Sequence, residues 1–159
     1  MAPNDVRFEL QEIDFDFVKP IWHEFLWPNR KTPILPTSPI EFMGDYDKSL
    51  LKSQPHFYGV FLGGEWVGIN SGFKTNFDGF RSRGLFVKKE YRRKGISQML
   101  FRACERDAIK SKSKFLWSMP RKTAFPSYLK FGFMQTSDWI DEKYEFGPNC
   151  FVRKQIVDI

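Results

Sequence analysis

Residues 85–100 read LFVKKEYRRKGISQML, and this stretch decides how the rest of the chain is interpreted. Its apolar start is typical of the end of a strand, and an amphipathic helix begins near Ser97. A helix start leaves about four backbone N–H groups unpaired and concentrates positive dipole there. Gly95 lets an anion approach that backbone closely, and Arg92, Arg93 and Lys94 add charge. The stretch predicts an anion site after a strand, with a solvated basic loop as the alternative.

The segments before this stretch are predicted as strands. Two of them, residues 57–62 and 66–73, flank Gly63-Gly64, a dipeptide typical of a two-residue hairpin turn. Asp78-Gly79 predicts another turn, which leads into a third strand over residues 80–88.

Helices and strands alternate after it. Apolar residues recur at helical spacing from Ser97 to about Lys110, a pattern that indicates a helix packed on a sheet. Residues 115–119 are predicted as a short buried strand, and residues 123–130 as a short helix broken or bent near Pro126. Residues 131–138 and 144–156 are predicted as a final pair of strands.

The N-terminal part is predicted to add an edge strand and a helix. Residues 6–13 alternate between apolar and polar, and residues 14–27 carry apolar residues at helical spacing. Asp14 or Asp16 is the expected helix cap.

A loop and a further helix are predicted to follow. Four prolines make residues 27–39 largely non-helical. Ser38, with Glu41 three residues on, predicts a helix that continues to about Leu51. The complete order of elements predicts a single α/β domain over residues 1–159, with a mixed central sheet.

Positive charge is concentrated around the opening stretch. The formal net charge is +6, but residues 81–114 hold 12 Lys or Arg against three acidic residues, a net of +9 that leaves −3 elsewhere. Neither Cys104 nor Cys150 belongs to a C-x-x-C pair or has a histidine at ligand spacing, so no metal is predicted. Without a secretory start or a long apolar run, the chain is interpreted as soluble, reduced and cytoplasmic, without membrane contact.

Two common phosphate-binding motifs are missing. No G-x-x-x-x-G-K-[ST] run for a nucleoside triphosphate and no G-x-G-x-x-G run for a dinucleotide occurs. Residues 63–68 have the glycine spacing of the former but continue with Ile69-Asn70. Kinase and dehydrogenase interpretations are therefore disfavoured.

The opening stretch resembles motif A of the GNAT superfamily of N-acetyltransferases, whose turn reads Gln or Arg, two residues, Gly, one residue, then Gly or Ala. Arg92 and Gly95 match this pattern, and Ser97 replaces the last small residue. Residues 124–133, AFPSYLKFGF, are similar to motif B, commonly Asn-x-x-Ala-x-x-x-Tyr-x-x-x-Gly-Phe, with Arg121 at the Asn position.

This resemblance covers roughly residues 57–156 and implies a GNAT-like fold, with six to seven strands flanked by helices, that uses acetyl-CoA. It implies that the backbone of Leu85, Phe86 and Val87 runs along the pantetheine arm. The pyrophosphate is then expected on the turn, held by Arg92, Arg93, Lys94, Gly95, Ile96 and Ser97.

The family's catalytic acid corresponds to Tyr128, which the resemblance implies protonates the departing CoA thiolate. A phenol stays protonated at neutral pH and can donate to a developing thiolate. No carboxylate lies on residues 80–87, where some relatives carry a Glu. Glu90 lies in the turn and matches a position that is usually on the surface in the family. The general base therefore stays open between a relayed water and three side chains, His23, His56 and Asp78.

The acceptor is expected to be a primary amine of a small molecule or peptide. An acidic cluster with interleaved aromatics, residues 138–145, would suit a cationic amine, and a solvated turn is the alternative interpretation. A degenerate domain that binds acyl-CoA or a protein without turnover also stays open, as does the choice between monomer and homodimer. Nucleic-acid binding is disfavoured, because the basic segment matches no recognition motif.

Overall fold

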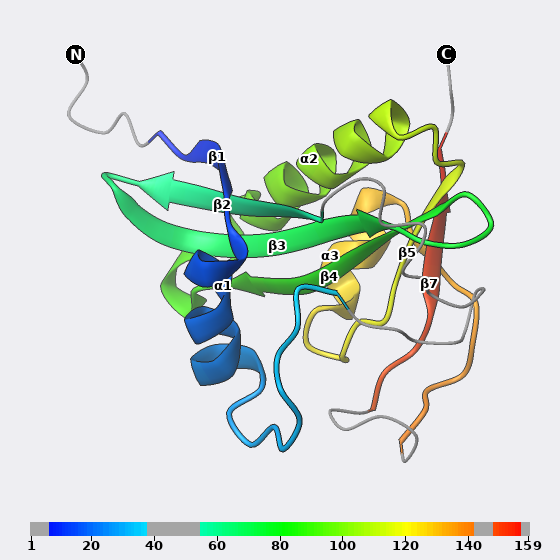
Figure 1. Ribbon diagram of the computed structural model, residues 1–159, viewed down its shortest axis with the longest axis horizontal. Coiled ribbons are helices and arrows are strands. Elements are labelled where there is room, and N and C mark those ends of the chain that lie inside the picture. Colours follow the sequence, from blue (N-terminus) through cyan, green and yellow to red (C-terminus); the bar gives the residue numbers. More distant parts are fainter. Residues whose placement is uncertain (1–6, 38–54, 142–147, 157–159) are drawn as a thin grey trace.

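The computed structural model of the protein describes residues 7–37, 55–141 and 148–156. Seven strands in these ranges form one sheet in the order β1-β2-β3-β4-β5-β7-β6 (Figure 1). Neighbouring strands are antiparallel except β4 and β5, which are parallel, so the predicted mixed sheet of six to seven strands is confirmed. The strands are β1 Glu9–Ile13, β2 His56–Leu62, β3 Glu65–Lys74, β4 Gly79–Val87, β5 Phe115–Ser118, β6 Met134–Gln135 and β7 Val152–Gln155.

Helices cover both faces of the sheet. Figure 1 shows α1 in front of the sheet and α2 and α3 behind it. The helical segments are α1 Phe15–Ile21, the π-helical η1 Trp22–Leu26, the 3-10 turn η3 Lys89–Tyr91, α2 Ile96–Lys110 and α3 Phe125–Phe131. None of these helices is long and apolar enough to cross a membrane.

An apolar cluster fills the space on each side of the sheet. Leu100 of α2 packs in one cluster with Tyr58 of β2, and Trp22 of η1 packs in the other with Phe57. Adjacent residues of β2 belong to different clusters because successive side chains of a strand point to opposite faces. The sheet is therefore buried on both faces around β2, β3 and β4.

The N-terminal elements follow the predicted order. Asp14 caps α1, since its carboxylate accepts a hydrogen bond from the Phe17 N–H at 2.9 Å. The predicted helix does not continue as a regular α-helix, because η1 closes with a bond from the Trp27 N–H to the Trp22 carbonyl at 2.7 Å. The helix predicted over 38–51 lies outside the described residues.

Two predictions in the C-terminal part need correction. Pro126 does not break α3, because it lies in the first turn, where its missing N–H would have no helical partner. The final strand pair exists and is antiparallel, but β6 and β7 are much shorter than residues 131–138 and 144–156. Residues 142–147 lie outside the described ranges.

A β-bulge interrupts the pairing of β3 with β4. Ile69 pairs with Phe86 and Ser71 pairs with Arg83, so two residues of β4, Gly84 and Leu85, face the single residue between them on β3. Gly84 has a φ of +81°, and a Cβ at this position would lie 2.3 Å from the Trp22 ring. The Trp22 indole also donates a hydrogen bond to the Gly84 carbonyl at 2.9 Å. The bulge thus joins β4 directly to η1.

Candidate functional site

A cavity of about 860 Å³ opens where β4 and β5 stop pairing. The two strands pair only from Gly79–Phe115 to Arg81–Trp117, whereas β4 continues to Val87. Its walls come from β4 from Arg81 onward, the turn before α2, the first part of α3, the end of β5 with the segment after it, and residues 25–30. The cavity therefore brings together segments that are far apart in the sequence.

The turn before α2 presents backbone N–H groups to this cavity. Gly95 is the N-cap residue of α2 with a φ of +81°, and the first helical bond runs from the Met99 N–H to the Gly95 carbonyl at 3.2 Å. The N–H groups of Ile96, Ser97 and Gln98 therefore precede the helical ladder. No acidic residue lies in the first turn of α2. The helix dipole and these N–H groups together favour an anion here.

The residues predicted from the sequence lie around the same cavity, with one exception. Lys94 is exposed and is not among the lining residues. Arg92 folds back toward the strand, where its Nε donates to the Val87 carbonyl at 3.2 Å. The predicted residues that line the cavity are Leu85, Phe86, Val87, Arg92, Arg93, Gly95, Ile96, Ser97 and Tyr128.

Tyr128 of α3 reaches the cavity with a buried hydroxyl group. Its oxygen lies 3.0 Å from the Ser118 hydroxyl at the end of β5 and 3.3 Å from the Ser82 hydroxyl of β4. Burial raises the pKa of Tyr128 above its ordinary value, despite the hydrogen bonds to the two serines. The phenol therefore stays protonated over the whole physiological pH range.

Four arginines that the sequence prediction did not select also line the cavity, and we call them the arginine cluster: Arg30, Arg81, Arg83 and Arg121. The Arg83 guanidinium lies 5.1 Å from the Trp22 ring and 4.9 Å from the Trp27 ring, and its Nη1 donates to the Leu35 carbonyl at 2.8 Å. The sequence does indicate that Arg81 and Arg83 lie together, because residues two apart on a strand point to the same face.

The other members of the cluster are held by the same loop and by β5. Arg30 stacks on Trp27 at 5.2 Å, and Arg81 lies 5.2 Å from the Trp117 ring. Arg121 donates a hydrogen bond to the Leu26 carbonyl. Aromatic rings and backbone carbonyls thus fix the guanidinium groups in place.

None of the candidate general bases lines this cavity. His23, His56 and Asp78 all lie elsewhere, as does Glu90, and the described lining residues include no Asp, Glu or His. The described part of the cavity wall is therefore cationic and neutral, without a side chain that accepts a proton near neutral pH.

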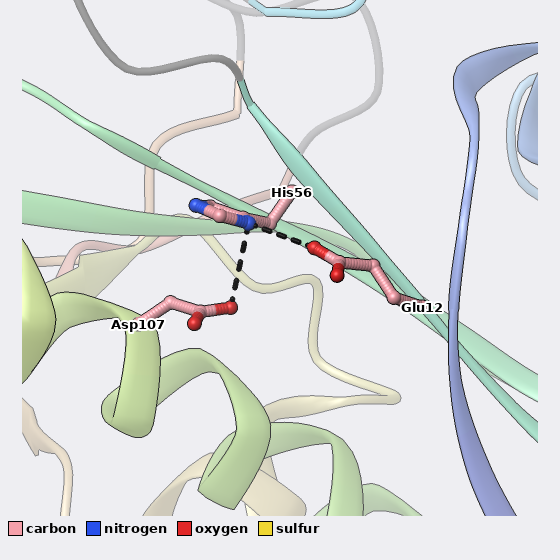
Figure 2. Close-up of side chains that lie close together, drawn as sticks. All are labelled: Glu12, His56 and Asp107. Atoms are coloured by element: carbon pink, nitrogen blue, oxygen red, sulfur yellow. Dashed lines mark hydrogen bonds and ion pairs between the residues drawn. The ribbon is translucent and has the colours of Figure 1, made fainter.

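Figure 2 shows where His56 lies instead, between Glu12 of β1 and Asp107 of α2. Its Nδ1 is 3.0 Å from the Glu12 carboxylate and 3.5 Å from that of Asp107. The Tyr58 hydroxyl donates to Asp107 at 2.7 Å, and Arg106 contacts the same carboxylate at 3.3 Å. The three ligand atoms of Glu12, His56 and Asp107 lie within 4.8 Å of one another, but the Asp107 carboxylate already holds two donors. This group is a polar link between the sheet and α2 that runs from the exposed Glu12 to the buried Asp107.

Comparisons with known proteins agree with this architecture. The family model for the Acetyltransferase (GNAT) family matches residues 19–133. An aminoglycoside 6'-N-acetyltransferase complexed with coenzyme A has a similar structure, with a TM-score of 0.68 at 12% identity, over 95% of this chain and 98% of that one. No curated protein sequence matches the chain.

Two bacterial structures give similar values. A GNAT-family acetyltransferase from Staphylococcus aureus Mu50 has a TM-score of 0.65 at 14% identity, over 94% of this chain and 99% of that one. The ribosomal-protein-S18-alanine N-acetyltransferase from Escherichia coli has a TM-score of 0.59 at 11% identity, over 92% and 91%. At these identities the structures show a shared fold, and the family model adds the sequence pattern. The chain therefore belongs to the GNAT family of acetyltransferases.

Proposed function

We propose that the protein transfers an acetyl group from acetyl-CoA to a primary amine, by direct attack in a ternary complex. Membership of the GNAT family gives acyl transfer from CoA as the general activity. One observation carries the finer proposal: a single cavity connects the N-terminus of α2 with the Tyr128 hydroxyl. An anion site suits the pyrophosphate of CoA, and a proton donor suits the thiolate that leaves when the thioester is cleaved.

The residues of the turn fit the CoA pyrophosphate. The N–H groups of Ile96, Ser97 and Gln98 and the dipole of α2 would hold it, with Arg92 and Arg93 as charged contacts. The described lining residues carry no carboxylate that would repel the phosphates. In this arrangement the pantetheine arm lies along Leu85, Phe86 and Val87 in the gap that β4 leaves beyond its pairing with β5.

Acetyl-CoA supplies a thioester as the acyl donor. The amine nitrogen forms a bond to the carbonyl carbon, the carbon–sulfur bond breaks, and Tyr128 donates its proton to the sulfur that leaves. The backbone N–H of Phe86 or Val87 polarises the carbonyl oxygen. Orientation of the two substrates contributes much of the acceleration, because the described wall offers few charged catalytic groups.

The amine must lose a proton during this reaction. The described lining residues include no histidine or carboxylate, so the proton passes to water held by backbone carbonyls. The acceptor then reacts as the neutral amine. The rate is expected to rise with pH until the bound amine is fully deprotonated, and the raised pKa of Tyr128 keeps the acid protonated through this range.

The named acceptors of the structural neighbours support an amine without specifying which one. An aminoglycoside and a ribosomal-protein alanine differ greatly in size, yet both enzymes are N-acetyltransferases. The same fold therefore accommodates different amines, and the acceptor of this chain depends on its own cavity residues.

Two measurements test the proposal. Acetyl-CoA at about 100 times its dissociation constant stabilises a folded protein by about 2.7 kcal/mol, so we expect the melting temperature to rise by several degrees. Release of free CoA thiol in the presence of an amine panel then reports transfer. No stabilisation by acetyl-CoA would refute the proposal. Stabilisation without thiol release across the panel would favour a binding domain without turnover.

A further inference from the structure

The arginine cluster is distinct from the cations of the turn. Arg81 and Arg83 of the arginine cluster lie on β4 before the bulge, whereas Arg92 of the turn lies beyond the end of this strand. Val87 lies four positions after Arg83, which is about 13 Å along an extended strand. The cavity therefore carries positive charge at two separate places, and the proposed CoA contacts account for only one of them.

The arginine cluster and the proposed acid line the same cavity from the two sides of β4. The Ser82 hydroxyl lies 3.3 Å from the Tyr128 hydroxyl, and the neighbouring Arg81 and Arg83 point to the opposite face of the strand. The acceptor amine must approach the thioester near this tyrosine, since the sulfur that leaves takes the tyrosine proton. The guanidinium groups are thus placed to contact the body of the acceptor.

The cluster is also fixed before any ligand arrives. Arg83 is 4% exposed, and the groups that hold it are the neutral Leu35 carbonyl and the rings of Trp22 and Trp27. Burial, followed by repulsion from Arg81 and Arg30, lowers the pKa of Arg83 well below its ordinary value. A ligand with negative charge would relieve this repulsion and would lose little entropy on binding to a preformed fork.

We propose that the acceptor is an amine that also carries an anionic group, a carboxylate or a phosphate, and that the arginine cluster binds this group. This inference rests on the proposed acetyl transfer. Guanidinium groups bind both anions in a bidentate manner, which would orient the acceptor as well as attract it. The amine end then points toward the thioester.

The same cluster has a second effect on the amine. Positive charge nearby disfavours the protonated amine and lowers its pKa. The cluster would thus increase the fraction of neutral, reactive amine in a cavity whose described wall has no side-chain base. A protonated amine without an anionic group would be repelled by the four guanidinium groups.

From the sequence, the acidic residues within 138–145 would suit a cationic acceptor. Asp138 and Asp141, the described carboxylates of this segment, are exposed and are not among the lining residues of the cavity. The charged side chains among the described lining residues have the opposite sign. We therefore favour an anionic group on the acceptor over a purely cationic amine.

Matched acceptor pairs test the inference. Each amino acid of a panel is compared with its amide, and phosphoethanolamine and glucosamine 6-phosphate are compared with ethanolamine and glucosamine. We measure kcat/KM by thiol release at saturating acetyl-CoA, and thermal stabilisation of the CoA-bound protein by each amine. The anionic member of at least one pair is expected to exceed its partner about tenfold, the range of one hydrogen bond to a charged group. The carboxylate and phosphate arms distinguish the two anions.

Variants assign the preference to the cluster. Arg30 and Arg121 are only partly buried, so Arg30→Gln and Arg121→Gln are the first choices. We expect each to raise KM for the anionic acceptor about tenfold and to leave KM for acetyl-CoA and for the uncharged partner nearly unchanged. Arg102→Gln removes an equal charge from the exposed face of α2, outside this cavity, and is expected to change neither constant.

The outcomes separate this inference from the proposed function. Equal responses within every pair, including no response, or a preference for the uncharged members would overturn the anionic acceptor while acetyl-CoA stabilisation still supports the transferase. A rise in KM for acetyl-CoA in Arg121→Gln, without change for the acceptor, would assign the cluster to CoA and would also overturn it. Absence of acetyl-CoA stabilisation in the wild type would reject both.

Discussion

The hydroxyl of Tyr128 is the single atom on which the proposed chemistry depends most. It lies in a buried network with Ser82 and Ser118 and lines the cavity. Tyr128→Phe removes the proton donor and keeps the ring, so we expect kcat to fall about 100-fold or more, while KM for acetyl-CoA changes little. Steady-state kinetics with thiol detection measure both constants.

Tyr58→Phe is the matched control for this change. Tyr58 is equally buried, but its hydroxyl bonds to Asp107 and lies outside the cavity. Both variants are expected to lose roughly 1 kcal/mol of stability with the lost hydrogen bond. If both lowered kcat alike, the effect of Tyr128 would be structural and its assignment as the acid would be wrong.

Asp107 predicts a dependence of stability on pH. Burial opposes its ionisation, but hydrogen bonds from Tyr58 and Arg106 and the charge of His56 lower its pKa in the folded protein. A lowered folded pKa gives stability that is present above the unfolded pKa, about 4, and is lost as the pH falls through the folded pKa. We expect the free energy of unfolding to fall below about pH 4, and Asp107→Asn to lack this part of the dependence.

Chemical denaturation of wild type and variant between pH 2 and 7 measures the difference. Asp78→Asn is the control, since Asp78 is half exposed and its carboxylate is 4.0 Å from Lys114. Parallel curves for the wild type and Asp107→Asn would show that this carboxylate is not stabilised by its neighbours.

A negative charge in the first turn of α2 is expected to stabilise the helix and to weaken the binding of an anion. A carboxylate at position 97 would interact favourably with the helix dipole, by about 0.3–1 kcal/mol, but would repel an anion bound there. Ser97→Asp is therefore expected to keep or raise the melting temperature while KM for acetyl-CoA rises about tenfold or more. Ser97→Ala, without charge, is expected to change KM much less. A fall in melting temperature that parallels the rise in KM would show damage to the helix rather than repulsion.

The bulge in β4 depends on a residue without a side chain. At Gly84 an added methyl group meets the Trp22 ring, and the φ of +81° is itself unfavourable for alanine. We expect Gly84→Ala to destabilise the protein by about 2 kcal/mol or more, through the backbone and the clash together. Gly63→Ala has a φ of +58° with open space around it, so about 1 kcal/mol is expected there. Urea denaturation measures the free energy of unfolding of both variants. Equal losses in Gly84→Ala and Gly63→Ala would show that the Trp22 ring moves away from the added methyl group without a loss of stability.

Elements set by local sequence could be predicted, and elements set by distant contacts could not. The Gly63-Gly64 hairpin and the start of α2 each depend on residues close together in the sequence, and both are present. The bulge at Gly84 depends on Trp22, 62 residues earlier, so its glycine gave no local signal. The prediction of a break at Pro126 was wrong because it placed the start of the helix at residue 123, two residues before the actual start of α3.

At the scale of the whole molecule, the parts of the cavity that come from one contiguous stretch could be predicted, and the parts that distant segments bring together could not. A contiguous motif gave the turn residues, because strand, turn and helix follow one another in sequence. The arginine cluster combines residues 30, 81, 83 and 121, which meet only when the loop after η1 packs beside β4 and β5. Its charge is visible in the sequence, but its convergence on one cavity is a property of the fold.

A crystal structure of the protein with CoA would test the central proposal most directly. We expect the pyrophosphate within hydrogen-bonding distance of the Ile96, Ser97 and Gln98 N–H groups, about 2.7–3.2 Å, and the thiol beside the Tyr128 hydroxyl. Occupied density in the β4–β5 gap with this orientation would support it. CoA bound elsewhere, or bound with its thiol remote from Tyr128, would contradict it.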